Sequence, residues 1–439
     1  MTHKTDTTPT KVHQDSKLGA IPDGWSVLKI SEVFQFINTT SFSRDQLNYD
    51  EESELYYIHY GDIHATYKKP LLDFEIEIKV PKLNSNVVLP NSIQYLKDGD
   101  VIIADASEDY DGVGEAIEIK NLNGKVAISG LHTFALRDVD NKTVAGFRTY
   151  IFKNPNVKKA LKTIATGSKV YGISKGNIQK FKIVLPTLPE QQKIAQILAT
   201  WDIAINKQEA LIAEKQLQKK ALMQQLLTGK MRFTGFEEEW EEKKLGDLGN
   251  TYSGLSGKTK EDFGSGKPYI PYMNIFKNSI IDHTYFDYVN VNNGEKQNRT
   301  KYGDIFFTIS SETPDEVGMA SVLLSNIDEL YLNSFCFGFR LNDFETLLPE
   351  FAAYYLRGVL FRKEMSKAAQ GATRFNLSKG NVTKVVLLLP SIEEQQKIAE
   401  VITATDNEIT ALQQQLQKLK TQKQGLMQQL LTGKIRVKN

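Results

Sequence analysis

The segment LMQQLLTGK occupies residues 222–230 and returns, letter for letter, at residues 426–434. The two copies lie 204 positions apart, and the match extends when the chain is aligned with itself at this shift. LPTLPEQQKIAQI at 185–197 falls on LPSIEEQQKIAEV at 389–401. The sequence is therefore one unit written twice, and the repeat decides the fold.

The similarity continues toward the start of each unit and weakens there. ISKGNIQKFKIVLP, from residue 173, falls on LSKGNVTKVVLLLP, from residue 377. GDVIIADASEDYDGVG at 99–114 falls on GDIFFTISSETPDEVG at 303–318, and further upstream the shift drifts to about 212–215. The ends of the two units therefore share one task, whereas their interiors perform different ones.

A long helix is predicted at the end of each unit, because apolar residues recur there with a spacing of seven. Acidic residues open the second helix, and Gly229 and Gly433 end the two helices. Polar residues interrupt the seams at Gln208, Lys215, Lys219, Thr405 and Lys423. The apolar seam positions are Ile194, Leu198, Trp201, Ile205, Ile212, Leu222 and Leu226 in the first copy, and Ile398, Ile402, Ile409, Leu412, Leu416, Leu419, Leu426 and Leu430 in the second.

Geometry favours an antiparallel pair of these helices. Each helix of about 39 residues is roughly 58 Å long, at 1.5 Å per residue. The linker GKMRFTGFEEEW has only about a dozen residues and spans at most about 40 Å. The second helix must therefore begin close to the region where the first one ends.

Before each helix lies a head of mixed pattern, in which short β-rich runs such as DVIIA, DIFFTI, FKIVLP and VVLLLP are broken by Gly, Asn and Asp. The fold class predicted is α/β (α+β) heads in two copies, joined by two long antiparallel coiled-coil helices with an internal pseudo-two-fold repeat. The predicted organisation is a disordered tail at 1–20, a first head at 21–187, a first helix at 188–232, a second head at 233–391 and a second helix at 392–439.

Composition narrows the class of protein. Cys336 is the only cysteine, so an internal disulfide framework is excluded. The sequence contains no run of 18 apolar residues, so a membrane-spanning helix is not expected. The polar N-terminus lacks the apolar core of a signal peptide. We therefore expect a cytoplasmic protein. The net charge of +1 argues mildly against a dedicated nucleic-acid binder, although local patches can still bind DNA.

Two similar heads on a rigid spacer suit duplex DNA, whose half-sites lie at fixed multiples of the helical repeat. The helix length limits the separation of the half-sites to about 17 base pairs. Because the head interiors differ, we expect the two half-sites to differ as well. The predicted target is an asymmetric bipartite site.

The chain resembles the specificity subunit of type I restriction–modification systems over about residues 21–437. The resemblance rests on LPTLPEQQKIAQIL and LPSIEEQQKIAEVI, each followed by a helix ending in LLTGK, and on TGSKVYGISKGNI in the first head. It implies that each head is a target recognition domain for one half of a split sequence of double-stranded DNA. It also implies that the helices set the spacer and dock two methyltransferase subunits, and that two restriction subunits join the larger complex.

The resemblance further implies a chain without a cofactor, since S-adenosylmethionine, ATP and Mg belong to the partner subunits. The residues agree with a non-catalytic role. No methyltransferase motif or zinc-binding cysteine pair is present, and SGLSGKT at 253–259 lacks the glycine that a phosphate loop needs at Tyr252. His59 and His64 would face opposite sides of a strand, so they predict no metal site.

DNA contacts are predicted on polar loops, where Lys and Arg position the phosphates and polar side chains recognise base edges. For any single residue, a solvated turn is the commoner explanation. The candidates in the first head are His59, Tyr60, Asp62, His64, Thr66, Tyr67, Lys68, Lys69, Ser107, Asp109, Tyr110, Ser168, Lys169 and Tyr171. Those in the second head are Lys258, Lys260, Tyr272, Asn274, Lys277, Asn278, Ser310, Ser311, Glu312, Thr373, Arg374 and Asn376.

Arg374 is the strongest single candidate, because an arginine fork can bond both acceptors of guanine. Glu108, Asp109 and Asp111 crowd one loop with negative charge, which either accepts from cytosine or faces a protein partner. Two other hypotheses stay open at this point. One is a two-headed coiled-coil scaffold for protein or glycan ligands, and the other is a self-contained restriction enzyme, for which the sequence lacks motifs.

Overall fold

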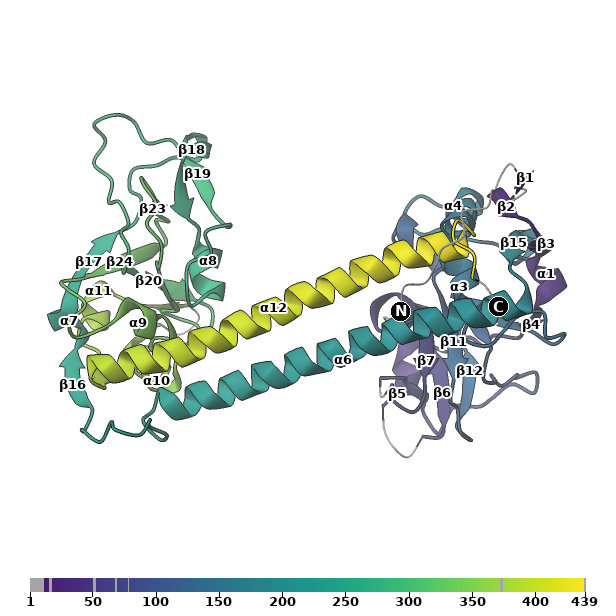
Figure 1. Ribbon diagram of the computed structural model, residues 1–439, viewed down its shortest axis with the longest axis horizontal. Coiled ribbons are helices and arrows are strands. Elements are labelled where there is room, and N and C mark those ends of the chain that lie inside the picture. Colours follow the sequence, from purple (N-terminus) through teal and green to yellow (C-terminus); the bar gives the residue numbers. More distant parts are fainter. Residues whose placement is uncertain are drawn as a thin grey trace. The chain divides into compact units, whose positions relative to one another are not determined.

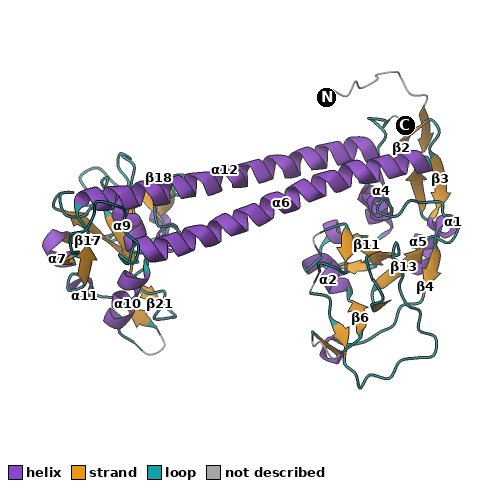
Figure 2. Cartoon of the chain, turned by 60° about the horizontal axis from the view of Figure 1, so that its bottom comes forward, coloured by secondary structure: helices purple, strands orange, loops and turns teal. Residues whose placement is uncertain are grey.

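The computed structural model of the chain describes residues 12–15, 18–49, 53–67, 69–77, 79–371 and 374–437. The chain divides into two compact units: the first comprises 1–208 and 415–439, and the second comprises 209–414. Each unit holds one head, part of helix α6 (Leu188–Leu226) and part of helix α12 (Ile392–Leu431), as Figures 1 and 2 show. The boundary between the units thus cuts both long helices.

The first unit is built on a five-stranded sheet in the order β4-β13-β9-β11-β7. All neighbours are antiparallel except β11 and β7. A second sheet, β12-β6-β8-β5, lies in the same unit. The strands are β4 (Gln35–Ile37), β5 (Leu47–Asn48), β6 (Leu55–Ile58), β7 (Leu71–Asp73), β8 (Lys82–Leu83), β9 (Val101–Ala104), β11 (Ala116–Lys120), β12 (Val126–Ser129) and β13 (Thr133–Arg137).

The second unit repeats this plan with fewer strands. Its main sheet has the order β17-β24-β20-β22, which matches β4-β13-β9-β11, and β19-β18-β23 contains a parallel pair like β12 with β6. The strands are β17 (Gly249–Ser253), β18 (Phe263–Ile270), β19 (Asp287–Val289), β20 (Ile305–Thr308), β22 (Ala320–Val322), β23 (Tyr331–Leu332) and β24 (Cys336–Leu341).

Short helices and small sheets complete each head in the same order. In the first unit these are α1 (Ile30–Val33), α2 (Tyr60–Ala65), α3 (Arg148–Lys153), α4 (Pro155–Ile164) and α5 (Lys175–Lys180), with the pairs β3 (Ser26–Lys29) with β15 (Lys182–Leu185) and β10 (Ala106–Ser107) with β14 (Tyr171–Gly172). In the second they are α7 (Leu245–Leu248), α8 (Tyr272–Lys277), α9 (Pro349–Tyr355), α10 (Val359–Ala368) and α11 (Lys379–Val382), with β16 (Glu241–Lys244) with β26 (Val386–Leu389) and β21 (Ser310–Ser311) with β25 (Phe375–Asn376). Across the two heads, strands β9 and β20 of the main sheets and strands β15 and β26 of the small sheets coincide with the predicted β-rich runs.

The two long helices form as predicted, but they end at Leu226 and Leu431, before the predicted bounds of 232 and 439. Helix α6 has 39 residues and α12 has 40. Gly229 and Gly433 follow their ends with φ of 69° and 67°, the left-handed conformation that glycine adopts readily. Bonds from Met231 N to Gln225 O and from Ile435 N to Gln429 O close the two ends in the same way. The repeated LLTGK is therefore the helix stop that the sequence predicted.

The helices run antiparallel where they meet inside each unit. In the first unit Lys423 pairs with Asp202 and Gln208 bonds Gln415, so the partner's number falls as the residue number on α6 rises. In the second unit, Lys215 pairs with Glu408 and Lys219 pairs with Asp406. Four of the five polar residues that interrupt the seams therefore form bonds between the two helices. The fifth, Thr405, donates to Val401 O within its own helix.

A carboxylate in the first turn of each helix ties the helix start to the other helix's end. In the first unit, Glu190 accepts from Arg436 (2.7 and 3.0 Å) and from Trp25 Nε1 (2.8 Å). In the second unit, Glu394 accepts from Arg232 (2.9 and 2.6 Å) and Trp240 Nε1 (3.3 Å). The repeated EQQKIA motif is thus explained by a Trp–Glu–Arg cluster that each unit builds once.

The first twenty residues differ from the expected disordered tail where the structure describes them. Strand β1 (Val12–Asp15) pairs antiparallel with β2 (Gly19–Pro22). Leu18 and Ile21 are buried in the core of the first unit, together with Leu430 and Leu431 of α12. Burial of these two apolar side chains provides the free energy that orders the segment. Among the described residues, no helix is long and apolar enough to cross a membrane.

Candidate nucleic-acid interface

Two pockets, one in each unit, collect many of the residues that the sequence singled out. The first pocket, of about 500 Å³, is lined by Tyr60, Gly61, His64, Ser107, Glu108, Asp109, Asp111, Gly112 and Glu115. The second pocket, of about 720 Å³, is lined by Tyr272, Met273, Phe276, Ser310, Ser311, Glu312, Glu316, Phe335 and Arg374. Equivalent elements form them: helix α2 or α8, and the strand β10 or β21 with the loop that follows it.

Local hydrogen bonds shape the first pocket. His59 caps helix α2, since its Nδ1 accepts from Gly61 N at 3.0 Å, and burial lowers the pKa of its ring. His64 places Nε2 3.0 Å from Ala106 O, which holds α2 against strand β10. Gly112 completes the wall, because a Cβ there would lie 2.5 Å from Ser107 Oγ. A side chain at position 112 would therefore crowd Ser107 and His64 in the wall of the pocket.

Carboxylates dominate the charge of the first pocket. Lys153 (2.5 Å) and Lys158 (3.4 Å) flank Glu115, and Lys162 pairs with Asp111. Burial raises the pKa of Glu115, but the two lysines outweigh burial and lower it overall. Glu108 and Asp109 line the same wall, and carboxylate oxygens accept hydrogen bonds from the amino groups of cytosine.

A hairpin stands beside the first pocket. Its strand β14 pairs with β10, so Tyr171 lies opposite Ser107. The Tyr171 ring meets the Tyr110 ring edge-on at 5.1 Å, and Tyr110 donates to Lys162 O. Ser168 and Lys169 are exposed at the tip of the hairpin. The hairpin thus brings three more of the predicted residues to the surface around the pocket.

Aromatic side chains and one arginine distinguish the second pocket. Tyr272 donates to Ser310 O at 2.9 Å, and its ring stacks on Phe276 at 5.9 Å. Arg374 Nη2 donates to Ser310 Oγ at 3.2 Å, so one corner of the guanidinium is fixed on the pocket wall. Phe335 is 64% exposed at the rim. The pocket therefore combines apolar surface with a forked donor.

The backbone under the second pocket is held by a buried arginine that the sequence did not single out. Arg357 donates to the carbonyl oxygens of Ile275, Phe276, Asn278 and Ala320, at 2.5–3.0 Å. Three of these carbonyls lie at the end of helix α8. Burial lowers the pKa of Arg357 to about 10. Arg357 therefore positions the helix that carries Tyr272.

Several predicted contact residues lie away from the accessible surface. Asp62 is buried because Arg44 bonds both of its carboxylate oxygens, at 3.0 and 2.7 Å. Asn274 is buried because it donates to Asp282 O and Tyr285 O, and accepts from Asn278. The Lys258 side chain is 6% exposed and pairs with Glu295. Hydrogen bonds from Lys258, Gln297 and Asn292 N lower the pKa of Glu295 to about 2. These groups already have partners within the chain.

The other predicted contact residues differ in their exposure to solvent. Lys69, Lys260, Lys277 and Asn376 are exposed, while Thr66 is half-buried at the end of α2 and Tyr67 is buried. Lys68 and Thr373 lie outside the described residues. Sequence reasoning missed Phe276, Phe335 and Glu316 in the second pocket, since no motif marks them and only the fold brings them to it.

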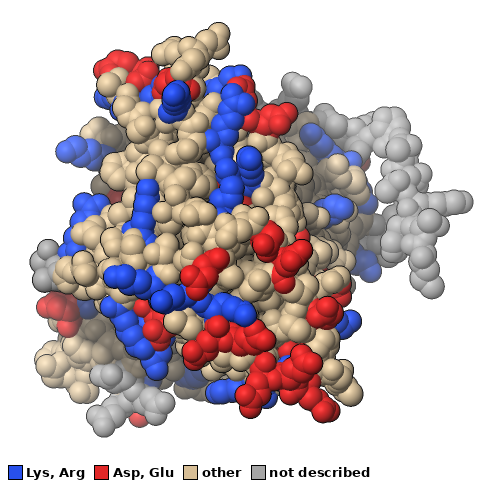
Figure 3. Space-filling model, turned by 90° about the vertical axis from the view of Figure 1, so that its left-hand side faces the viewer, with Lys and Arg blue, Asp and Glu red and all other residues tan. Residues whose placement is uncertain are grey.

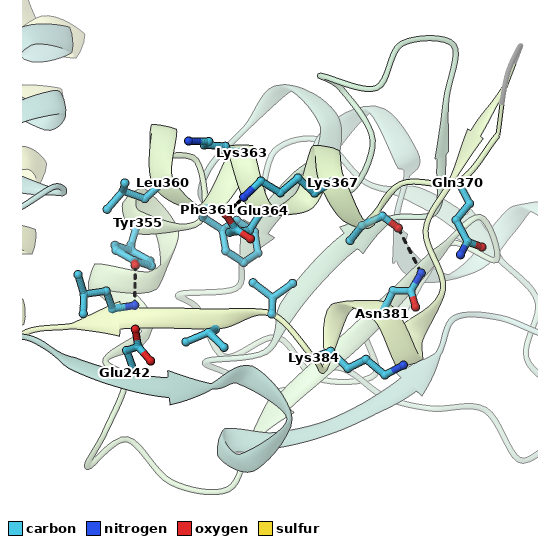
Figure 4. A pocket seen from close by; sticks show the side chains of 14 residues that line it. Glu242, Tyr355, Leu360, Phe361, Lys363, Glu364, Lys367, Gln370, Asn381 and Lys384 are labelled. Carbon is cyan, nitrogen blue, oxygen red and sulfur yellow. Dashed lines mark hydrogen bonds and ion pairs between the residues drawn. The ribbon is translucent and has the colours of Figure 1, made fainter.

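A groove of about 710 Å³ lies elsewhere on the second unit, between α10 and the β16–β26 pair (Figure 4). Three bonds join residues of its lining: Leu388 N donates to Tyr355 Oη, Lys367 pairs with Glu364, and Asn381 donates to Ala368 O. None of its lining residues was a predicted contact. Volume alone therefore does not select the binding surface.

Charges of both signs are interspersed on the face seen in Figure 3, which views the molecule from the side of the second unit. Lysine and arginine side chains form short stripes between clusters of Asp and Glu. This pattern agrees with the balanced net charge of +1. A surface of this kind adds little long-range attraction for a polyanion.

Comparison with known proteins identifies the family. The family model of the type I restriction modification DNA specificity domain matches residues 22–214 and 237–421. Of the curated relatives, the type I restriction enzyme MjaVIII specificity subunit of Methanocaldococcus jannaschii is 27% identical, with 95% of each chain covered. The EcoKI specificity subunit of Escherichia coli is 23% identical, with 87% of this chain and 82% of the relative covered.

Solved structures share the fold. The type I restriction–modification S subunit from M. genitalium aligns over 92% of this chain and 96% of its own, with a TM-score of 0.51 and 16% identity. A chain from a structure on complex assembly and conformational transition of the type I system covers 94% and 98%, with a TM-score of 0.59 and 18% identity. Two heads of one plan, each followed by a long helix, are what the family model matches twice, and the chain belongs to the type I restriction–modification DNA specificity family.

Proposed function

We propose that the two pockets and their hairpins each recognise one half of an asymmetric bipartite site on double-stranded DNA. The observation that carries this proposal is the convergence of predicted residues at equivalent places in the two heads. Both surfaces rest on corresponding elements, yet their side chains differ: carboxylates and histidine line the first, and aromatics with Arg374 line the second. Because the two heads share their backbone elements but present different side chains, we expect them to recognise two different half-sites.

The side chains present suit recognition of base edges in the major groove. Arginine bonds O6 and N7 of guanine, carboxylates accept from the amino group of cytosine, and serine bonds either kind of partner. The exposed Lys69, Lys169, Lys260 and Lys277 lie on the same heads and suit phosphate contacts. Asp62, Asn274, Asn278 and Lys258 are left out of the proposed contact set, because their polar groups have partners within the chain.

The long helices are proposed to set the distance between the two half-sites and to dock two methyltransferase subunits, which two restriction subunits join. In this assignment the chain is not catalytic and holds no cofactor, and S-adenosylmethionine, ATP and Mg act in the partner subunits. The balanced charge supports dependence on a partner, since a chain of net charge +1 gains little from counterion release alone.

Methylome sequencing of the host with and without this gene tests the proposal. We expect one split motif to lose methylation when the gene is removed and to regain it on complementation. Binding of that motif by the assembled methyltransferase complex should weaken steeply with added salt. An unchanged methylome, or a ligand that is protein or glycan with little salt dependence, would show that the chain is a scaffold of another kind.

A further inference from the structure

The two heads carry a matching hairpin beside their pockets, at residues 166–172 in the first head and, as far as the structure describes it, at 370–371 and 374–376 in the second. In each hairpin the first and last residues exchange two backbone hydrogen bonds: Thr166 with Gly172 (2.9 and 2.8 Å) and Gln370 with Asn376 (3.0 and 2.8 Å). The next residue then anchors the hairpin to the head, as Ile173 N donates to Asp105 O and Leu377 N donates to Ile309 O, both at 2.8 Å. The backbone is thus presented in the same way twice.

A glycine fixes the turn of each hairpin. Gly167 and Gly371 both have φ of +136°, which disfavours any other residue. A Cβ at Gly167 would lie 1.8 Å from Val170 O, and one at Gly371 would lie 2.1 Å from Arg374 O. The tip residues Val170 and Arg374 therefore occupy the same place in the same turn, 204 positions apart.

The side chains at this position differ in chemistry. Arg374 is exposed and lines the second pocket, and one of its N–H groups bonds Ser310 Oγ. Val170 is 52% exposed, although a hairpin tip of this kind usually carries a polar residue. The two residues directly before Val170, Ser168 and Lys169, are both polar. The exposed isopropyl side chain of Val170 thus takes the place of the forked guanidinium donor of Arg374.

We propose that this hairpin position selects one base in each half-site, with Arg374 bonding a guanine and Val170 contacting the 5-methyl group of a thymine. The inference rests on the proposed function in DNA recognition and adds the class of base to each head. Apolar contact with the thymine methyl group is a recognised mode of major-groove recognition, and arginine on guanine O6 and N7 is the commonest specific contact. The hairpin backbone is the same in both heads, and the side chain at this one position determines which base each head recognises.

Analogue duplexes test the inference in the methyltransferase complex assembled with its partner subunits. The half-sites come from the methylome, and each thymine on either strand of the first half-site is replaced, one at a time, by uracil, which lacks only the methyl group. One replacement should weaken binding by the native complex about 3- to 5-fold, the effect of burying one methyl group. The complex with Val170→Ala should be insensitive to that replacement and keep its response to all others.

The second head supplies the matched control. Guanines of the second half-site are replaced by 7-deazaguanine, which lacks the N7 acceptor, and one replacement should weaken native binding about 10-fold or more. Arg374→Ala should abolish that response and leave the uracil response intact. Val170→Thr keeps the branched shape, so it checks that the result for Val170→Ala does not come from a misfolded hairpin.

The possible outcomes distinguish a wrong assignment of Val170 from a wrong proposal of DNA recognition. Equal uracil responses in the native and Val170→Ala complexes, or a first half-site without thymine, overturn the assignment of Val170 and leave DNA recognition standing. Tighter binding with a 5-methylcytosine–guanine pair than with a cytosine–guanine pair at that position supports the methyl contact, because these two pairs differ only in the methyl group. A complex that binds no specific duplex would instead overturn the proposed function.

Discussion

Lys423 of helix α12 donates to Asp202 of helix α6 at 2.5 Å, and the repeat places the same pair a second time, as Lys219 with Asp406. Each lysine lies at a seam position where the heptad pattern calls for an apolar side chain. The lysine side chains are 14% and 22% exposed, so both charges are partly desolvated. An antiparallel alignment satisfies both pairs at once, and a shift of one turn would leave four charges unpaired.

These pairs are therefore expected to fix the direction and register of the helix pair. Lys423→Ala should lower the free energy of unfolding by about 1 kcal/mol, and a double-mutant cycle with Asp202→Ala should recover a coupling of about 0.5–1 kcal/mol. Lys418→Ala, on an exposed turn of the same helix, should change stability little. A coupling near zero would mean that the apolar seam alone sets the register.

The Trp–Glu–Arg clusters should contribute more. Glu394 is 1% exposed and accepts from Arg232 and Trp240. Glu394→Ala removes the acceptor of the Trp240 Nε1–H and of two Arg232 N–H groups, although Arg232 Nη1 keeps its bond to Glu238 O, and it should cost about 3 kcal/mol of unfolding free energy. The neighbouring Glu393 is exposed, so Glu393→Ala serves as the control. Chemical denaturation of the two variants compares them directly, and equal midpoints would contradict the role of Glu394.

Arg374→Ala should weaken binding of the assembled complex to its own site by about 1–3 kcal/mol without impairing assembly. Arg374→Lys keeps the charge but loses the planar fork, so it should retain nonspecific, salt-dependent binding and lose discrimination at one base. Fluorescence anisotropy with specific and mismatched duplexes measures both effects. Normal binding and methylation by Arg374→Ala would remove this residue from the interface.

Much of the fold could be predicted from the sequence, because its signals are local or repeated. The heptads and the glycine stops predict the helices, and the β-rich runs coincide with β9, β20, β15 and β26. The site could be predicted only in part. Asp62 and Lys258 are polar residues on candidate loops, but their partners Arg44 and Glu295 lie 18 and 37 residues away. A pairing at that distance follows from the folded chain and leaves no local pattern.

The pH dependence of stability should reveal a buried carboxyl group in the first unit. Burial raises the pKa of Glu118 to about 7, although Gly146 N and Thr149 N donate to its oxygens. A raised pKa means that folding favours the protonated form. Its contribution is therefore fully present below about pH 4.5 and is lost as the pH rises through about 7, up to about 3 kcal/mol.

Glu118→Gln should remove this dependence, because the amide stays neutral. Melting temperatures at intervals between about pH 5 and 8 should fall for the native protein and stay flatter for the variant. Glu115→Gln provides the opposite case, since its lysine partners lower the pKa of Glu115 overall. That variant should lose stability at neutral pH and little in acid. Parallel profiles for the native protein and Glu118→Gln would contradict the assignment.

The last prediction concerns the length of the helix pair. Because ion pairs join α6 to α12 on both sides of the helix centre, an insertion between Asp202 and Lys215 in α6 alone cannot keep all of them. A matched insertion of seven residues after Gln208 and after Gln414 keeps the heptad phase and lengthens the pair by about 10 Å. We expect the spacer of the methylated motif to grow by about three base pairs while both half-sites stay unchanged. A four-residue insertion before Leu222 in α6 alone lies beyond Lys219, so it should keep both Lys–Asp pairs but move Arg232 away from Glu394 and lower the melting temperature. Methylome sequencing measures the spacer, and a change in the bases of either half-site would show that the helices also take part in base recognition.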